Sequence, residues 1–312
     1  MLKQGFVPQE EGLSLLEMMA STAILLIVIA IIMAAMMQLM TVQGSIANRT
    51  GMHRSVRSAT ELLQQEIGQA GRISLPGAVT LTAGIPSGTQ TALVSSSTGM
   101  FAGMYLDVDT GANFETVQAT AIGTNTVTAQ FTFAHATTTQ IIVSGSFGTG
   151  IVPPAAAPTN YTNGSTGSIL KLYGDINRDG KILYVEYTCV PGTPSAPGFL
   201  YRNEISFTSA SKPAVTAGMV LLSNLLPNPD GSACFAYQTD SGKSGNTYVV
   251  DVAVTLTVQT QVQDPQTHQL QQETKALLNV SPRNVFEAWE LDNASSLLRI
   301  QPMPASVTLL LP

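Results

Sequence analysis

An uncharged, apolar stretch near the amino terminus constrains this chain more than any other feature. No charged residue occurs from Met18 to Asn48, and a single carboxylate, Glu17, directly precedes the stretch. About 20 consecutive apolar residues cross the hydrocarbon core of a bilayer as a helix, so we predict a membrane-spanning helix here. A carboxylate in such a segment costs on the order of 2–4 kcal/mol unless it has a partner. We therefore expect Glu17 to have a specific role.

The helical pattern continues beyond the apolar stretch in amphipathic form. Gly71 is a suitable residue to end the helix. The sequence predicts one helix from Leu13 to about Ala70, about 87 Å long at 1.5 Å per residue, with Gly44 and Gly51 as points where it can bend. Its later apolar residues recur at helical spacing: Ile46, Val56, Leu63, Ile67 and Ala70.

From Gly77 onward the chain consists of short runs rich in Thr, Val and Gly. Residues 116–122, 126–133 and 248–258 alternate apolar and polar side chains with period two, which is typical of β-strands. Residues 78–143 are predicted to form a self-contained β insertion, and the residues after Ser295 follow no pattern that we can assign. The fold class expected is α+β, with a long N-terminal helix packed on an antiparallel β-rich head.

Composition and charge exclude several functions. Only 11% of residues are charged and the net charge is −6. Binding to nucleic-acid phosphates requires clustered Lys and Arg side chains, and such clusters do not dominate this sequence. The three histidines, His53, His135 and His268, are far apart and none has zinc-ligand spacing. We expect no enzymatic activity and no nucleic-acid partner.

The chain has two cysteines, Cys189 and Cys234. If the head lies outside the cytoplasm, it is in a compartment where disulfides persist. A bridge between these two would stabilise the fold by about 4 kcal/mol through loop-closure entropy. The alternative is two separate buried thiols.

One segment matches the pattern of a calcium-binding loop. Asp175, Asn177 and Asp179 occupy the first, third and fifth positions, Lys181 would contribute its carbonyl, and Glu186 is at the twelfth position. The flanking residues indicate strands, not the helices of an EF-hand, so Glu186 would be carried away along a sheet. The sequence therefore leaves two interpretations open: a Ca²⁺ site, or a turn built from residues that favour turns.

The amino-terminal segment Gly12-Leu13-Ser14-Leu15-Leu16-Glu17 resembles the class III signal of type IV prepilins and type II secretion pseudopilins. The resemblance implies that a prepilin peptidase cuts between Gly12 and Leu13, that the amine of Leu13 is then methylated, and that Glu17 becomes the fifth mature residue. In fibers of this family that carboxylate pairs with the amino-terminal amine of a neighbouring subunit. The alternative is a plain single-pass anchor.

Two later segments are similar to W-type minor pilins and J-type pseudopilins. Residues 59–71 are similar to the end of their long helix. Residues 248–259 and 273–280, joined by 261–272, are similar to their closing β-hairpin. The resemblance implies a head in which a small antiparallel sheet lies on the second half of the helix.

These patterns together predict the organisation of the chain. Residues 1–12 are a leader peptide, residues 13–40 the transmembrane half of the helix and residues 41–71 its amphipathic half. Residues 72–312 form the β-rich head, which contains the insertion at 78–143.

The resemblance implies a minor pilin that primes or joins a type IV pilus. Its expected partners are other pilins or pseudopilins through the long helix, the prepilin peptidase, the inner-membrane assembly platform and the lipid bilayer. The expected location is the bacterial inner membrane as a single-pass protein with its head in the periplasm, and then the pilus or pseudopilus. The alternatives are a type II secretion pseudopilin and a membrane-anchored, calcium-dependent adhesive module.

Overall fold

The computed structural model describes residues 14–155 and 163–312. The fold class is α+β, as predicted: a 55-residue helix, α1 (Leu15–Gln69), precedes and packs against antiparallel β-sheets. The predicted leader, residues 1–12, lies outside the described residues. The chain divides into two compact units. The first consists of Met1–Gly51 with Thr260–Gln271, and the second of Met52–Gln259 with Gln272–Pro312.

In the first unit, α1 meets one short segment from far along the chain. From Leu15 to Met40 every side chain of the helix is exposed. From Thr41 to Asn48 one face of the helix becomes half-buried, and the segment 260–271, here called the collar loop, is hydrogen-bonded there. The helix is continuous through both predicted bending points, Gly44 and Gly51.

The second unit contains the larger sheet, here called the main sheet. Six of its seven strands are hydrogen-bonded in the order β12-β13-β11-β10-β9-β8. The seventh, β14, also pairs with β13, and all pairs are antiparallel. The β13–β14 pair corresponds to the predicted closing hairpin. The strands are β8 (Ile169–Gly174), β9 (Leu183–Val190), β10 (Gly198–Ser206), β11 (Val220–Leu226), β12 (Phe235–Ser241), β13 (Thr247–Gln259) and β14 (Gln272–Val280).

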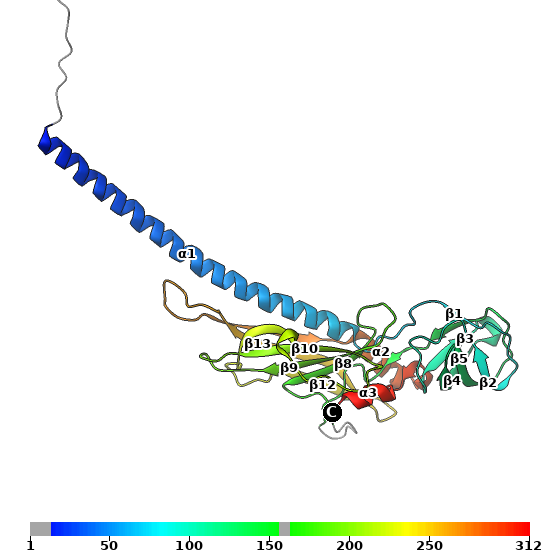
Figure 1. The fold of residues 1–312 in the computed structure, drawn as a ribbon. Coiled ribbons are helices and arrows are strands. Elements are labelled where there is room, and N and C mark those ends of the chain that lie inside the picture. The colour runs from blue at the N-terminus through cyan, green and yellow to red at the C-terminus, as the bar shows by residue number, and fades with distance from the viewer. Residues whose placement is uncertain (1–13, 156–162) are drawn as a thin grey trace, which may run out of the picture. The chain divides into compact units, whose positions relative to one another are not determined.

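The second half of α1 lies on this sheet because it carries a continuous apolar stripe (Figure 1). Met52, Val56, Ala59, Leu63 and Ile67 recur every three or four residues, which places them on one face of a helix, and all are buried. They share a core with apolar residues of β8, β9, β10, β11 and β13. Each fully buried large side chain contributes about 1.5–3 kcal/mol relative to exposure. This stripe fixes the helix to the head.

The segment predicted as a β insertion forms a six-stranded antiparallel sheet, here called the insert sheet, with the order β1-β6-β3-β4-β5-β2. Alternating apolar residues of its strands, such as Leu106, Val117 and Val127, are buried in its core. The strands are β1 (Val79–Thr80), β2 (Gly88–Leu93), β3 (Tyr105–Val108), β4 (Glu115–Gly123), β5 (Thr126–Phe131) and β6 (Gln140–Val143).

Short elements complete the second unit. β7 (Ser146–Phe147) pairs in parallel with β15 (Ile300–Gln301). The helices α2 (Arg283–Asn293) and α3 (Ala305–Leu310) bury Val285 and Leu310, respectively. The 3-10 turns are η1 (Gly111–Asn113), η2 (Ala217–Met219) and η3 (Leu297–Arg299).

Candidate functional site

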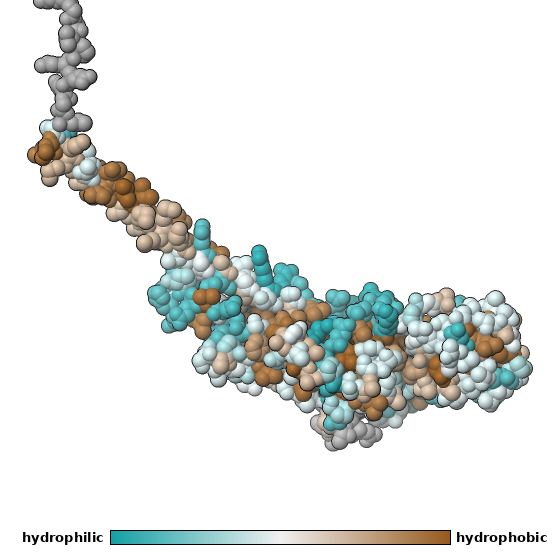
Figure 2. All heavy atoms as spheres, in the orientation of Figure 1, coloured by the Kyte–Doolittle hydropathy of each residue, from teal (hydrophilic) through white to brown (hydrophobic). Residues whose placement is uncertain are grey.

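The first half of α1 is the most distinctive surface of the described chain. Its large apolar side chains from Leu15 to Met40 are between 45% and 80% exposed. Figure 2 shows them as brown patches along this part of the helix. By length and composition the helix is able to cross a membrane. An apolar surface of this size in contact with water is unfavourable, and it is consistent with a single membrane span or a signal segment.

The described part of this helix begins with a polar cap. The hydroxyl of Ser14 accepts a hydrogen bond from the backbone N–H of Glu17 at 3.2 Å. A Ser followed three residues later by Glu is the pattern of a capping box, in which both side chains satisfy free N–H groups at the helix start. The bond shown here involves the backbone N–H of Glu17, so it caps the start of α1 without using the carboxylate. The predicted cleavage site, Gly12 and Leu13, lies outside the described residues.

The second half of α1 carries a different carboxylate, Glu66, which is buried under the main sheet. Its two oxygens accept hydrogen bonds from Arg202 Nε (3.0 and 3.2 Å), and Oε1 also accepts one from Arg202 Nη2 (2.5 Å). The hydroxyl of Tyr187 donates to Oε2 at 2.6 Å. Arg202 also pairs with Glu204 at 2.7 Å. This network, with one member on α1 and the others on β9 and β10, supplies the partners that a buried charge requires.

The network shifts the pKa values of Tyr187 and Arg202. Burial raises the pKa of the Tyr187 hydroxyl, and the charge of Glu66 raises it further, so Tyr187 stays protonated and donates its hydrogen bond. Burial alone would lower the pKa of Arg202, but the bonds to Glu66 outweigh burial and raise it. The sequence signal for Glu66 is its position in the buried stripe of α1, one residue before Ile67.

The predicted calcium loop lies between β8 and β9. Asp175 is fully buried, and its Oδ1 accepts backbone N–H groups of Asp179 (2.9 Å) and Gly180 (3.2 Å). Its Oδ2 accepts the hydroxyl of Ser74 at 2.5 Å. Asn177, Asp179 and Lys181 are exposed. Both oxygens of Asp175 thus have protein partners, as in a turn held by its own aspartate.

The structure does not bring Glu186 to this loop. In β9 it is directly opposite Lys171 of β8, three positions along the ladder from the pair that flanks the loop. Glu186 is buried, and its Oε2 accepts the hydroxyl of Tyr184 and the ammonium of Lys212, both at 2.7 Å. Across residues 14–155 and 163–312, no three His, Cys, Asp or Glu side chains are grouped so as to hold a metal ion.

The loop also fixes the chain where it leaves α1. The backbone N–H of Asp175 donates to the carbonyl of Arg72 at 2.8 Å, and Arg178 Nε donates to the side chain of Gln69 at 3.1 Å. Gly180 has φ +78°, and a Cβ there would lie 2.3 Å from the backbone N of Pro76. Glycine is required for that conformation and that approach. The loop therefore braces the end of the helix.

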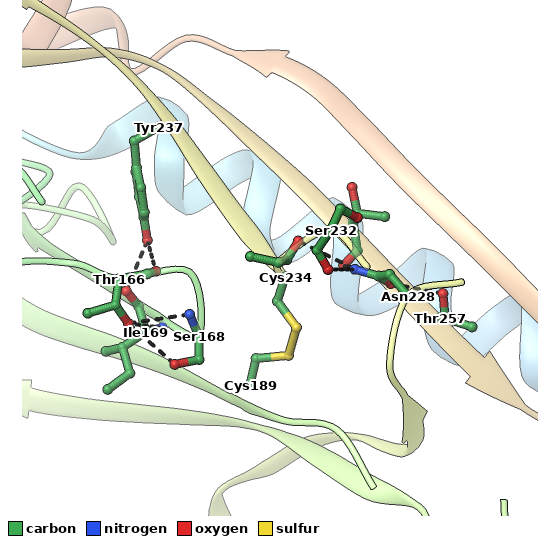
Figure 3. The surroundings of a disulfide bond; sticks show 11 residues. Thr166, Ser168, Ile169, Cys189, Asn228, Ser232, Cys234, Tyr237 and Thr257 are labelled. Atoms are coloured by element: carbon green, nitrogen blue, oxygen red, sulfur yellow. Dashed lines mark hydrogen bonds between the residues drawn. A yellow bond between two sulfur atoms is a disulfide. The ribbon is translucent and has the colours of Figure 1, made fainter. Parts of the chain in front are cut away.

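A disulfide between Cys189 and Cys234 is present, as predicted, and joins β9 to the residue directly before β12 with a Cα–Cα distance of 6.5 Å (Figure 3). The neighbouring turn is held by Asn228, whose amide donates to the carbonyl of Ser232 at 3.0 Å and whose Oδ1 accepts the hydroxyl of Thr257 at 2.8 Å. The bond closes a separation of 45 residues. Its expected contribution is about 4 kcal/mol.

The sequence did not indicate one buried cluster of the insert sheet, in which a single histidine lies between two carboxylates. The ring of His135 is fully buried, with Nδ1 3.1 Å from Asp109 Oδ2 and Nε2 2.7 Å from Glu115 Oε1. The backbone N–H of Thr110 and then His135 lower the pKa of Asp109. Burial alone would raise the pKa of Glu115, but hydrogen bonds from Thr132 and other donors lower it. This arrangement orders the loops around it.

Comparisons of the chain with family models, curated proteins and solved structures found no match. The class of the protein is therefore defined by its architecture. A long apolar N-terminal helix followed by an antiparallel β-rich domain is a pilin-like architecture.

Proposed function

We propose that this chain is a minor pilin, a subunit that primes or joins a type IV pilus. The observation that carries the proposal is the division of α1: a helix whose first part is exposed and apolar continues without a break into a part that is buried on an antiparallel sheet. A head that needs only a tether does not require a continuous helix that also forms its core. A continuous helix is required in a subunit whose position in a helical bundle must be transmitted to its head.

The proposal assigns partners to each part of the chain. The prepilin peptidase acts between Gly12 and Leu13, and the inner-membrane platform and lipid bilayer hold the helix before assembly. Other pilins pack on the exposed face of α1, where Glu17 pairs with the amine of a neighbouring subunit. The disulfide between Cys189 and Cys234 supports placement of the head in the periplasm, because such bonds persist there.

Incorporation into fibers tests the proposal. Glu17→Gln keeps a polar side chain of the same size but removes its charge, whereas Glu17→Ala removes both the polar group and the charge. We expect both variants to reach the membrane and to be depleted in sheared fibers, because an apolar bundle tolerates an unpaired amine poorly. Glu61→Ala is the matched control, since Glu61 is an exposed carboxylate of the same helix that pairs with Arg57. Normal amounts of Glu17→Gln in fibers would contradict the assembly role.

Calcium binding is a separate proposal for the loop after β8. Asn177, Asp179 and the carbonyl of Lys181 offer the oxygen ligands that Ca²⁺ prefers, and Asp175 would join them in exchange for its bonds to Ser74 and the backbone. The exposed positions of Asn177 and Asp179 support access for an ion. Glu186 is excluded from this proposal by its bonds to Tyr184 and Lys212.

A further inference from the structure

The collar loop is attached to α1 by a buried carboxylate. Asp264 is 3% exposed, and its Oδ2 accepts the hydroxyl of Ser45 at 2.5 Å. The side-chain amide of Gln271 donates to the same oxygen. The Oδ1 atom accepts backbone N–H groups of Gln266 (2.8 Å) and Thr267 (3.1 Å). One side chain therefore orders the loop and attaches it to the helix at the same time.

Two further contacts extend the attachment along the helix. Arg49 Nε donates to Gln271 Oε1 at 2.6 Å. The ring of Pro265 lies 3.1 Å from the position that a Cβ on Gly44 would occupy. A side chain at Gly44 would therefore force the ring of Pro265 to move by at least a few tenths of an ångström. At Gly51, in the same helix, an added Cβ would meet no atom within 4 Å.

The attachment begins where the apolar run ends. Met40 is the last residue of the exposed apolar run, and the helix face covered by the collar loop starts at Thr41. Gly44 is about 6 Å and Asn48 about 12 Å beyond Met40 along the axis. The headgroup layer on each side of the hydrocarbon core is about 5–7 Å thick. With the hydrocarbon edge at Met40, the first contact of the loop, at Gly44, falls at the depth of the lipid headgroups, and the later contacts lie beyond them.

We propose that the collar loop rests on the headgroup layer of the bilayer and sets the depth to which α1 is inserted. The inference rests on the membrane span of the proposed function. A single helix satisfies its own backbone groups and enters lipid, but an irregular loop cannot, because each unsatisfied polar group in hydrocarbon costs several kcal/mol. The loop is polar and widens the helix on one side, so it acts as a stop. Its partner is a phospholipid surface.

Depth-dependent quenching tests this inference. Because both cysteines of the sequence are in the disulfide, one added cysteine can carry a fluorophore selectively. The label is placed by Val262→Cys in the collar loop, Met33→Cys in the apolar run or Val215→Cys in the head, and all three native side chains are exposed. The full chain is reconstituted in phosphatidylcholine–phosphatidylglycerol vesicles with a nitroxide on the headgroup or midway along the acyl chain.

We expect the headgroup nitroxide to quench the Val262→Cys label at least about twofold more than the acyl nitroxide. The reverse is expected for Met33→Cys, and neither nitroxide should quench Val215→Cys. A Val262→Cys label that neither nitroxide quenches, or that the acyl nitroxide quenches more strongly, overturns the inference while Met33→Cys still reports a membrane span. A Met33→Cys label that neither nitroxide quenches overturns the span itself and with it the proposed function.

A matched pair of variants tests whether the contact at Gly44 holds the loop in place. Gly44→Val and Gly51→Val make the same change in the same helix, but only the first meets Pro265. Headgroup quenching of the Val262→Cys label should fall by about half in Gly44→Val and stay unchanged in Gly51→Val. Equal quenching in the two variants would contradict the role of this contact, provided that circular dichroism shows both to be folded.

Discussion

The two parts of α1 are made from one continuous helix but belong to different environments. From Leu15 to Met40 the apolar side chains surround the helix on all sides and are exposed, whereas from Met52 to Ile67 they form one buried stripe. The carboxylates differ in the same way: Glu17 is exposed beside a helix cap, and Glu66 is buried with Arg202 and Tyr187. Apolar content alone does not say what a helix packs against; the distribution of apolar residues around the axis does.

The carboxylates provide the largest expected contrast. Glu66→Ala leaves Arg202 without its main partner, and breaking a buried pair on one side costs about 3–5 kcal/mol. Glu17→Ala should change the stability of the head by less than about 0.5 kcal/mol, because surface substitutions have small effects. Urea unfolding of the detergent-solubilised full chain, followed by tyrosine fluorescence, measures both. Equal losses would remove the distinction between the two parts.

A pair of leucine substitutions tests the same comparison without charge. Leu63 is fully buried on the main sheet, and Leu63→Ala should destabilise the head by about 3 kcal/mol through lost burial and the cavity left behind. Leu26 is exposed, and Leu26→Ala should leave the unfolding midpoint of the head unchanged. A similar shift for Leu26→Ala in the same urea experiment would mean that the first part of α1 also contributes to the head.

Addition of Ca²⁺ tests the loop after β8, which holds the end of the buried part of α1. If Asp175 and Asp179 bind Ca²⁺, an ion at a hundred times its dissociation constant would stabilise the fold by about 2.7 kcal/mol. Differential scanning fluorimetry of metal-free protein should then show a higher Tm with Ca²⁺ than with Mg²⁺. Asp179→Ala should abolish the shift and Glu186→Gln should not. A Tm that millimolar Ca²⁺ does not change would leave the loop as a brace only.

The smallest effect concerns pH at the collar loop. The hydrogen bond from Ser45, followed by those from backbone donors such as Gln266, lowers the pKa of Asp264 below its usual value of 3.8. The carboxylate thus stabilises the collar loop fully above pH 3.8, and this stabilisation is lost as the pH falls through the lower pKa of the folded state.

The mobility of a spin label at Val262→Cys should therefore rise only below pH 3.8, as electron paramagnetic resonance measures. Asp264→Asn, which has no carboxylate at this position, should show no such step. A step of the same size in both proteins would assign it to another group.

Much of the fold could be predicted from local pattern. The period-two runs at 116–122, 126–133 and 248–258 correspond to β4, β5 and β13, because alternation is a short-range signal. Of the predicted apolar stripe of α1, Val56, Leu63, Ile67 and Ala70 are buried, but Ile46 is 59% exposed. With only two cysteines the pairing was unambiguous, and the structure shows the bridge rather than two separate thiols. The helix α2 was missed because its buried side chains include Asp292 and its N-cap is Pro282, which makes no capping hydrogen bond.

The contacts of the candidate site could not be predicted because they join residues far apart in the sequence. Glu66 and Arg202 are 136 positions apart, and Ser45 and Asp264 are 219 apart. Each residue alone is compatible with an exposed surface, and only the tertiary fold brings the partners together. Asp175 shows the converse: its loop pattern was visible, but its partner Ser74 was not.

The most direct test of the account is the amino terminus of the protein extracted from membranes of cells that contain an active prepilin peptidase. Intact mass and amino-terminal sequencing should show a chain that begins at Leu13 with one added methyl group, with Glu17 as its fifth residue. A chain that keeps residues 1–12, in cells where the peptidase processes another substrate, would contradict the pilin assignment and leave α1 as an ordinary anchor.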